Sequence, residues 1–302
     1  MWEIYNNGNY TVFLNTENGT KIRYNNSDVL ICDRPESMDV KITNKCNHGC
    51  LFCHENSTSM GQEATYNILK EFAANVLPYT EIAVGGGNLM CNLEHTEFFL
   101  KELQKTKAIS SITVQQQDFI EFYYVIKKWI EEKLVYGVGV SVDNPTNNLL
   151  HEYLQDCPNA VIHTIVGMYD ENYFKPLMNK GYKILFLGFK SFRRGSKYYQ
   201  AKEKFIQENT EWLNNNIVSL NKAFKVISFD NLALEQLNMK EKVSQKMWDT
   251  LYCGDDGCFT FYVDLVEQTY TLNSTTLERQ SINGQTPVEM FKDIRSRYGN
   301  QH

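Results

Sequence analysis

From residue 38 onward, short runs of apolar, β-branched residues alternate with stretches in which apolar positions recur every three or four residues. The first pattern is typical of buried parallel strands and the second of amphipathic helices, so their alternation indicates repeated strand–helix units. Strands are predicted at 39–43, 81–84, 111–115, 136–142, 160–166 and 183–188, with an edge strand at 224–229 and helices at 66–76, 97–105, 119–133 and 203–221. Six such units make three quarters of a (β/α)8 barrel. The predicted fold class is therefore α/β, a partial (β/α)6 TIM-like barrel.

The two ends of the chain depart from this pattern. Residues 10–31 alternate and turn at Asn18-Gly19, which predicts a β-hairpin. After helical patterns at 231–237 and 239–251, residues 258–264 and 268–272 predict a second hairpin, and 287–298 a last helix. We therefore expect an N-terminal β-hairpin extension (1–36), a partial barrel (37–230) and a C-terminal α+β extension of helices and a hairpin (231–302).

Composition and charge limit the cellular compartment and the classes of partner that we expect. No apolar run approaches the roughly 20 residues that span a bilayer, and the first residues lack a secretory pattern, so we expect a cytoplasmic protein with no membrane partner. Eight cysteines in that compartment indicate metal ligands or buried thiols. A net charge of -6 argues against a nucleic-acid partner. The locally basic segment 190–197 is either a solvated helix start or an anion site.

Cys46, Cys50 and Cys53 follow the first predicted strand closely in the string KCNHGCLFCH. Three thiolates at this spacing suit a four-iron cluster and leave one iron without a protein ligand, where a cosubstrate can bind. A zinc site completed by His48 or His54 is the alternative, although zinc ligands usually come as two separated pairs. Because the loop follows a barrel strand, the thiolates are expected at the C-terminal mouth of the barrel.

The second predicted strand ends in Gly85-Gly86-Gly87-Asn88. This Gly-rich strand end, after a C-x-x-x-C-x-x-C loop, resembles the radical S-adenosylmethionine (radical SAM) enzymes. Strings such as CHENS (53–57) and GDDG (254–257) also resemble a group of short radical SAM proteins from Firmicutes and their phages. The resemblance implies a [4Fe-4S] cluster and SAM, which is cleaved reductively to a 5′-deoxyadenosyl radical that abstracts hydrogen from a substrate.

The same resemblance implies SAM-binding roles for residues at successive strand ends. Asn88 stands where Glu is commoner, and its amide oxygen can still accept a hydrogen bond from the SAM amino group. Asp143 is a ribose candidate, but Asp143-Asn144-Pro145 is alternatively a turn and helix start. His163 is expected to be a packed histidine rather than a base. The SAM-binding candidates are Phe52, Gly85, Gly86, Gly87, Asn88, Ser141, Asp143, Ile165 and Leu187.

Polar residues at strand ends should face the same mouth, and each is alternatively a cap or loop residue. The catalytic, substrate-side candidates are Gln115, Lys190, Arg193 and Asp230. They suit a small polar substrate such as a nucleoside or nucleotide, with a one-electron donor such as flavodoxin or ferredoxin. A peptide substrate fits less well, since neither a peptide-binding extension nor a tail for auxiliary clusters is recognised. A cluster that only passes electrons and a non-catalytic iron–sulfur or zinc protein are the remaining alternatives.

Overall fold

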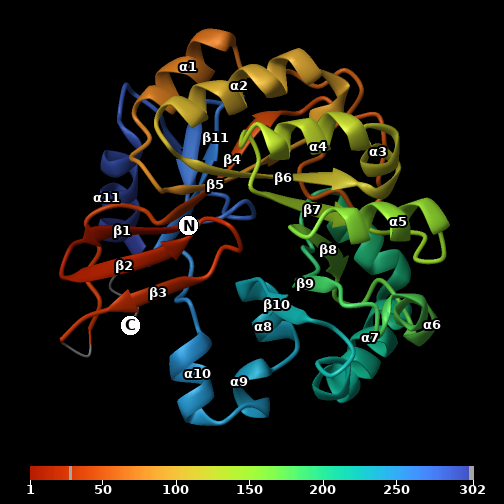
Figure 1. Ribbon diagram of the computed structural model, residues 1–302. Helices are drawn as coiled ribbons and strands as arrows, with labels where there is room; N and C mark the ends of the chain where they lie inside the picture. The colour runs from red at the N-terminus through yellow and green to blue at the C-terminus, as the bar shows by residue number, and fades with distance from the viewer. Residues whose placement is uncertain (27–28, 299–302) are drawn as a thin grey trace.

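The computed structural model describes residues 1–26 and 29–298 and contains one large mixed sheet with helices along its outer side (Figure 1). The sheet order is β10-β9-β8-β7-β6-β5-β4-β11-β12-β13, and neighbours from β10 to β11 pair in parallel. The strands predicted from the sequence are β4 (Ser37–Thr43), β5 (Glu81–Gly86), β6 (Ile109–Gln115), β7 (Gly137–Ser141), β8 (Ala160–Ile165), β9 (Lys183–Leu187) and β10 (Val226–Phe229). The α/β class is confirmed, and the parallel part of the sheet extends beyond the six predicted units.

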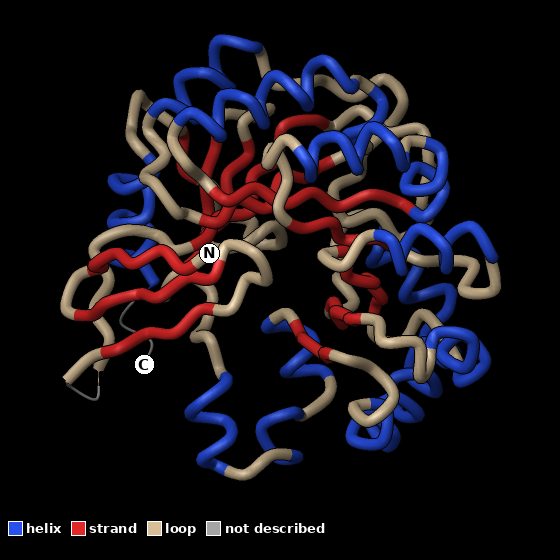
Figure 2. The backbone as a smooth tube through the Cα atoms, viewed as in Figure 1, coloured by secondary structure: helices blue, strands red, loops and turns tan. Residues whose placement is uncertain are grey.

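Helices connect successive strands and cover the outside of the arc that the strands form (Figure 2). Side-chain caps begin several of them: Thr65 accepts from the Ile68 amide, and Asn147 from the Leu150 amide. The helix predicted at 119–133 is interrupted at Phe122, whose φ and ψ are -102° and 17°. The connecting helices are α1 (Tyr66–Ala74), η1 (Leu89–Cys91), α2 (Leu93–Lys105), α3 (Gln116–Glu121), α4 (Tyr123–Glu131), α5 (Asn148–Asp156), α6 (Glu171–Phe174), η2 (Lys175–Leu177) and α7 (Arg194–Leu220).

Side chains of successive residues along the strands point alternately to the two faces of the sheet, one of which packs in the core while the other borders a pocket. Val138 and Val140 of β7 and Ile162 of β8 are buried in the core. Residues of the opposite parity, such as Ser141 and Ile165, line a pocket instead. Residues of one parity on β7 and β8 therefore pack in the core, and those of the other parity border the pocket on the inner side of the sheet.

The N-terminal extension is a three-stranded antiparallel sheet of β1 (Trp2–Asn7), β2 (Tyr10–Asn15) and β3 (Lys21–Tyr24). The predicted hairpin is β2–β3, and Gly19 in its turn has a φ of 75°. The prediction was wrong in omitting β1, because its apolar positions gain a partner only in the register Ile4↔Phe13. Pairing with β2, rather than the local pattern, makes this segment a strand.

The C-terminal extension consists of α8 (Asn231–Gln236), α9 (Met239–Lys242), α10 (Gln245–Leu251), β11 (Thr260–Asp264), β12 (Thr269–Thr271), β13 (Gln280–Ser281) and α11 (Pro287–Tyr298). The predicted hairpin forms as β11–β12, but β11 also pairs in parallel with β4, in the register Phe261↔Met38. The hairpin therefore continues the central sheet. No helix in the described ranges is both long and apolar enough to cross a membrane.

Candidate functional site

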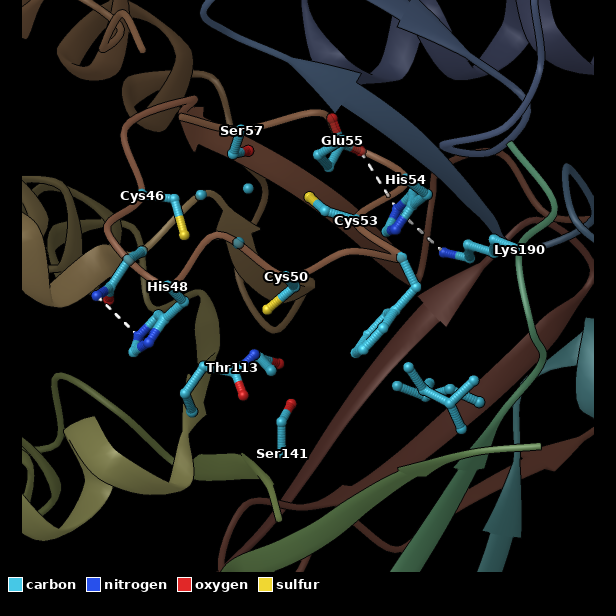
Figure 3. A pocket seen from close by; sticks show the side chains of 18 of the residues that line it. Cys46, His48, Cys50, Cys53, His54, Glu55, Ser57, Thr113, Ser141 and Lys190 are labelled. Carbon is cyan, nitrogen blue, oxygen red and sulfur yellow. Dashed lines mark hydrogen bonds and ion pairs between the residues drawn. The ribbon is translucent and has the colours of Figure 1, made fainter. Parts of the chain in front are cut away.

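A pocket of about 230 Å³ lies at the carboxyl ends of the parallel strands. The sulfurs of Cys46, Cys50 and Cys53 point into it from the loop after β4 (Figure 3). Most of the residues predicted for the site meet here. Those that line the pocket are Cys46, Cys50, Phe52, Cys53, Gly85, Gly86, Gly87, Asn88, Gln115, Ser141, Ile165, Leu187 and Lys190.

The loop that carries the cysteines is fixed through its backbone. The Cys46 amide donates to the Thr58 carbonyl at 2.8 Å, and the Thr58 amide donates to Asn44 at 3.1 Å. Gly49 permits a tight turn with a φ of 64°. All the cysteines of the chain are free thiols, and burial together with the neighbouring thiols raises the pKa of Cys50. The loop therefore presents three accessible sulfur ligands from a constrained backbone.

The three glycines at the end of β5 do different things. A Cβ at Gly86 would lie 2.3 Å from the Thr43 carbonyl oxygen, and one at Gly87 would lie 2.2 Å from that of Lys45. These two glycines let the strand end pack against the cysteine loop. A Cβ at Gly85 would meet no atom within 4 Å. Of the three, only Gly85 borders open space that a ligand can enter.

Asn88 has three side-chain contacts, one of which joins its Nδ2 to His48 Nε2 at 3.1 Å. Its Oδ1 accepts from the Met90 amide at 2.9 Å and begins η1, while its Nδ2 donates to Asn47 Oδ1 at 2.7 Å. A second lone pair on Oδ1 remains for a ligand donor. Beside it, His48 Nε2 lies 2.5 Å from Asp118 Oδ2, so the buried carboxylate fixes the imidazole ring. The sequence analysis did not identify Asp118, although it lies just beyond a strand end.

Three predicted residues lie outside the pocket lining. Asp230 caps α8 by accepting from the Ala233 amide at 2.7 Å, and it also accepts from the Gly188 amide at 2.9 Å. Asp143 is exposed two residues beyond the end of β7. Arg193 donates to the Glu55 carbonyl at 2.9 Å. Asp230 and Arg193 thus support neighbouring backbone, as the cap or loop alternative anticipated.

The basic segment 190–197 also has a structural task that its sequence did not reveal. Besides Arg193, Arg194 donates to the carbonyl of Ser57 at 2.5 Å. Both arginines therefore hold the cysteine loop through its backbone carbonyls at the start of α7. Lys190 differs, because it borders the pocket and donates to Ser274 Oγ at 2.9 Å.

Next to the third cysteine, His54 and Glu55 connect the loop to the C-terminal extension. Lys190 Nζ lies 3.5 Å from His54 Nε2 (Figure 3). Burial and the charge of Lys190 lower the pKa of His54. Burial alone would raise the pKa of Glu55, but the hydrogen bond from His54 and the charge of Lys41 outweigh it and lower that pKa. Glu55 is therefore ionised, and His54 beside it is biased towards the neutral form.

His163 on β8 is half-buried, and a Cβ added at Gly139 would lie 2.1 Å from its ring. Burial lowers the pKa of His163 to about 4. The expectation of a packed, neutral histidine agrees with this position.

The sequence and the structure were compared with those of known proteins. No protein-family model matches the sequence, and no curated protein matches it. Among solved structures, SuiB of Streptococcus suis bound to S-adenosylmethionine matches with a TM-score of 0.64 and 9% identity, over 98% of this chain and 89% of SuiB. SuiB bound to the precursor peptide SuiA matches with a TM-score of 0.60 and 10% identity, over 99% of this chain and 90% of SuiB. The chain therefore has the fold of SuiB along nearly its whole length.

Proposed function

We propose that this chain is a radical SAM enzyme that binds a [4Fe-4S] cluster through Cys46, Cys50 and Cys53. The observation that carries the proposal is the convergence of these thiols and the open side of Gly85 on one pocket. Three thiolates with no fourth cysteine in the pocket lining suit a cluster that keeps one iron open. The shared fold with SuiB, which was determined with SAM bound, supports SAM as the second occupant.

When bound, the cluster supplies one electron that cleaves SAM to methionine and a 5′-deoxyadenosyl radical. Gly85 leaves room for SAM, and the Asn88 amide oxygen accepts from its amino group. Ser141 lines the pocket and is our preferred ribose ligand, while Asp143 is exposed just beyond the same strand. The apolar side chain of Ile165 lines the same pocket and provides a surface for adenine.

Other SAM contacts come from the loop and the next strand. The ring of Phe52 is fixed edge-on against Tyr198, with centroids 5.7 Å apart, which orients its backbone beside the pocket. Leu187 at the end of β9 also borders the pocket. Phe52 and Leu187 then contact the adenine, as the resemblance implies.

The substrate that we propose is a peptide rather than the small polar molecule expected from sequence. That expectation depended on finding no peptide-binding extension. The likeness to SuiB, however, includes both extensions, and one SuiB structure holds a precursor peptide. Gln115 and Lys190 border the pocket and remain the substrate-side candidates, while Arg193 and Asp230 act through the backbone that they hold.

An external one-electron donor, such as flavodoxin or ferredoxin, is required by this scheme. The remaining cysteines give no sign of a second cluster. Cys32 donates to the Cys258 carbonyl at 3.0 Å, and Cys157 is buried at the end of α5. Cys253 is exposed.

The test is anaerobic reconstitution with iron and sulfide, followed by dithionite reduction and assay of 5′-deoxyadenosine after SAM is added. We expect about four irons and four sulfides per chain, and formation of 5′-deoxyadenosine, with both lost in Cys46→Ala, Cys50→Ala and Cys53→Ala. Cys157→Ala is the matched control and should behave as wild type.

The outcomes separate the alternatives. Zinc without sulfide would indicate the non-catalytic zinc protein. A full cluster whose electron paramagnetic resonance spectrum does not change when SAM is added would indicate a protein that only transfers electrons. Full iron content in Cys50→Ala would contradict the ligand assignment.

A further inference from the structure

Ser57 lines the same pocket as the three cysteines, and its hydroxyl has no hydrogen-bond partner among the described residues. The side chain is only 2% exposed. A buried hydroxyl without a partner costs about 1–3 kcal/mol, so such groups usually have a ligand, ion or water to bind. Neither capping nor strand pairing accounts for this hydroxyl.

The place of Ser57 is set by rigid neighbours. Its carbonyl accepts from Arg194 at 2.5 Å, so the backbone oxygen is occupied. The next residue, Thr58, accepts the Cys46 amide at 2.8 Å, which ties the Ser57 segment to the first cysteine. Figure 3 shows Ser57 on the cysteine-loop side of the pocket, opposite Thr113 and Ser141. The hydroxyl therefore belongs to the cluster side rather than to the strand ends assigned to SAM.

We propose that the Ser57 hydroxyl donates a hydrogen bond to a sulfur of the cluster and raises its reduction potential. Reduction adds negative charge to the cluster, and a donor aimed at a sulfur stabilises that charge more in the reduced state. No proton is transferred in this step. The inference depends on the proposed function, because it requires the cluster.

The test is an equilibrium redox titration of reconstituted protein without SAM, followed by electron paramagnetic resonance. In Ser57→Ala we expect reduction to become about tenfold less favourable, a shift of about 59 mV to more negative potential for one electron. Ser110→Ala is the matched control. Ser110 is also 2% exposed, but its hydroxyl donates to the Leu134 carbonyl and does not line the pocket. The potential of Ser110→Ala should equal that of wild type.

Two further results decide the inference. An unchanged potential in Ser57→Ala, with full iron and sulfide content, would overturn it while leaving the proposed function intact. Failure of wild-type protein to assemble a cluster would instead overturn the proposed function. If Ser57→Ala itself assembles no cluster, Ser57→Thr decides: it keeps the hydroxyl and should retain the wild-type potential, whereas a tenfold shift would refute the hydrogen bond.

Discussion

Both extensions contact the same strand, β4, through networks of buried charge: the N-terminal sheet at its amino end, and the C-terminal extension, whose β11 also pairs along the strand, towards its carboxyl end. At the amino end, Glu36 is 1% exposed and precedes the strand. It accepts from Arg23 at 2.9 and 3.0 Å and from Tyr10 at 2.6 Å, and Lys21 lies 3.1 Å away. These partners all belong to the N-terminal sheet.

At the other end, Lys41 lies 2.9 Å from both Glu55 and Asp264. Tyr262 donates to Glu55 at 3.0 Å, so β11 supplies both an acid and a hydroxyl. This network holds the loop that carries the third cysteine. At about 3.3 Å per residue, the five-residue step from Glu36 to Lys41 places the two networks about 17 Å apart along the strand. Similar charge networks therefore have different roles. The C-terminal network supports the loop of the candidate site, and the N-terminal network attaches a sheet.

Lys41→Met should have the largest effect, because it leaves Glu55 and Asp264 facing each other without their shared cation. We expect a loss of roughly 3–5 kcal/mol in the free energy of unfolding, with lower iron content after reconstitution. Urea unfolding and iron analysis measure the two effects. Full iron content would show that the C-terminal network does not support the cysteine loop.

Glu36→Gln tests the other end of the strand and should cost less. Its cationic partners are each 17% exposed and so keep some hydration. Loss of hydrogen bonds to a charged group should lower the free energy of unfolding by roughly 2–3 kcal/mol, with iron content per folded chain unchanged. A fall in iron comparable with that of Lys41→Met would erase the distinction between the two ends.

His163 lies outside both carboxylate networks, so its titration gives a separate pH dependence of the free energy of unfolding. Its pKa falls from 6.5 to about 4 on folding, so the unfolded chain takes up the proton first as the pH drops. Neutral His163 therefore contributes roughly 2–3 kcal/mol to the free energy of unfolding. This contribution is complete above pH 6.5 and is lost as the pH falls towards 4.

His163→Gln should remove that part of the pH dependence. The difference in unfolding free energy between wild type and variant, measured at pH 7 and pH 4, should change by this amount. Parallel pH profiles for the two proteins would show that the imidazole titrates equally in both states.

Cys91→Ala should have the smallest effect. Its thiol makes only a 3.4 Å contact to Asn47 Oδ1 and does not line the pocket. Iron and sulfide per chain should equal wild type when measured beside Cys46→Ala. Loss of iron would indicate that Cys91 is a fourth cluster ligand. The proposed function would then fail, because it needs one iron without a protein ligand.

The sequence predicted the parallel strands well because each is a short β-rich run that packs the same way in any such sheet. It also predicted that the thiols and glycines lie close together, since these follow directly on strands whose carboxyl ends share one edge, and in the structure they line one pocket. It could not decide the roles of Arg193 and Asp230, because a polar residue after a strand can face the mouth or cap nearby backbone with the same local pattern.

The sequence by itself determined the alternation of strands and helices, the three-cysteine loop and the Gly-rich strand end, all of which depend on residues close together in the chain. Only the tertiary structure decided that β11 pairs with β4, that Lys41 joins Glu55 to Asp264, and that Ser57 is buried without a partner. Lys41 and Asp264 are 223 residues apart. Contacts over such distances depend on burial and geometry that no local pattern encodes.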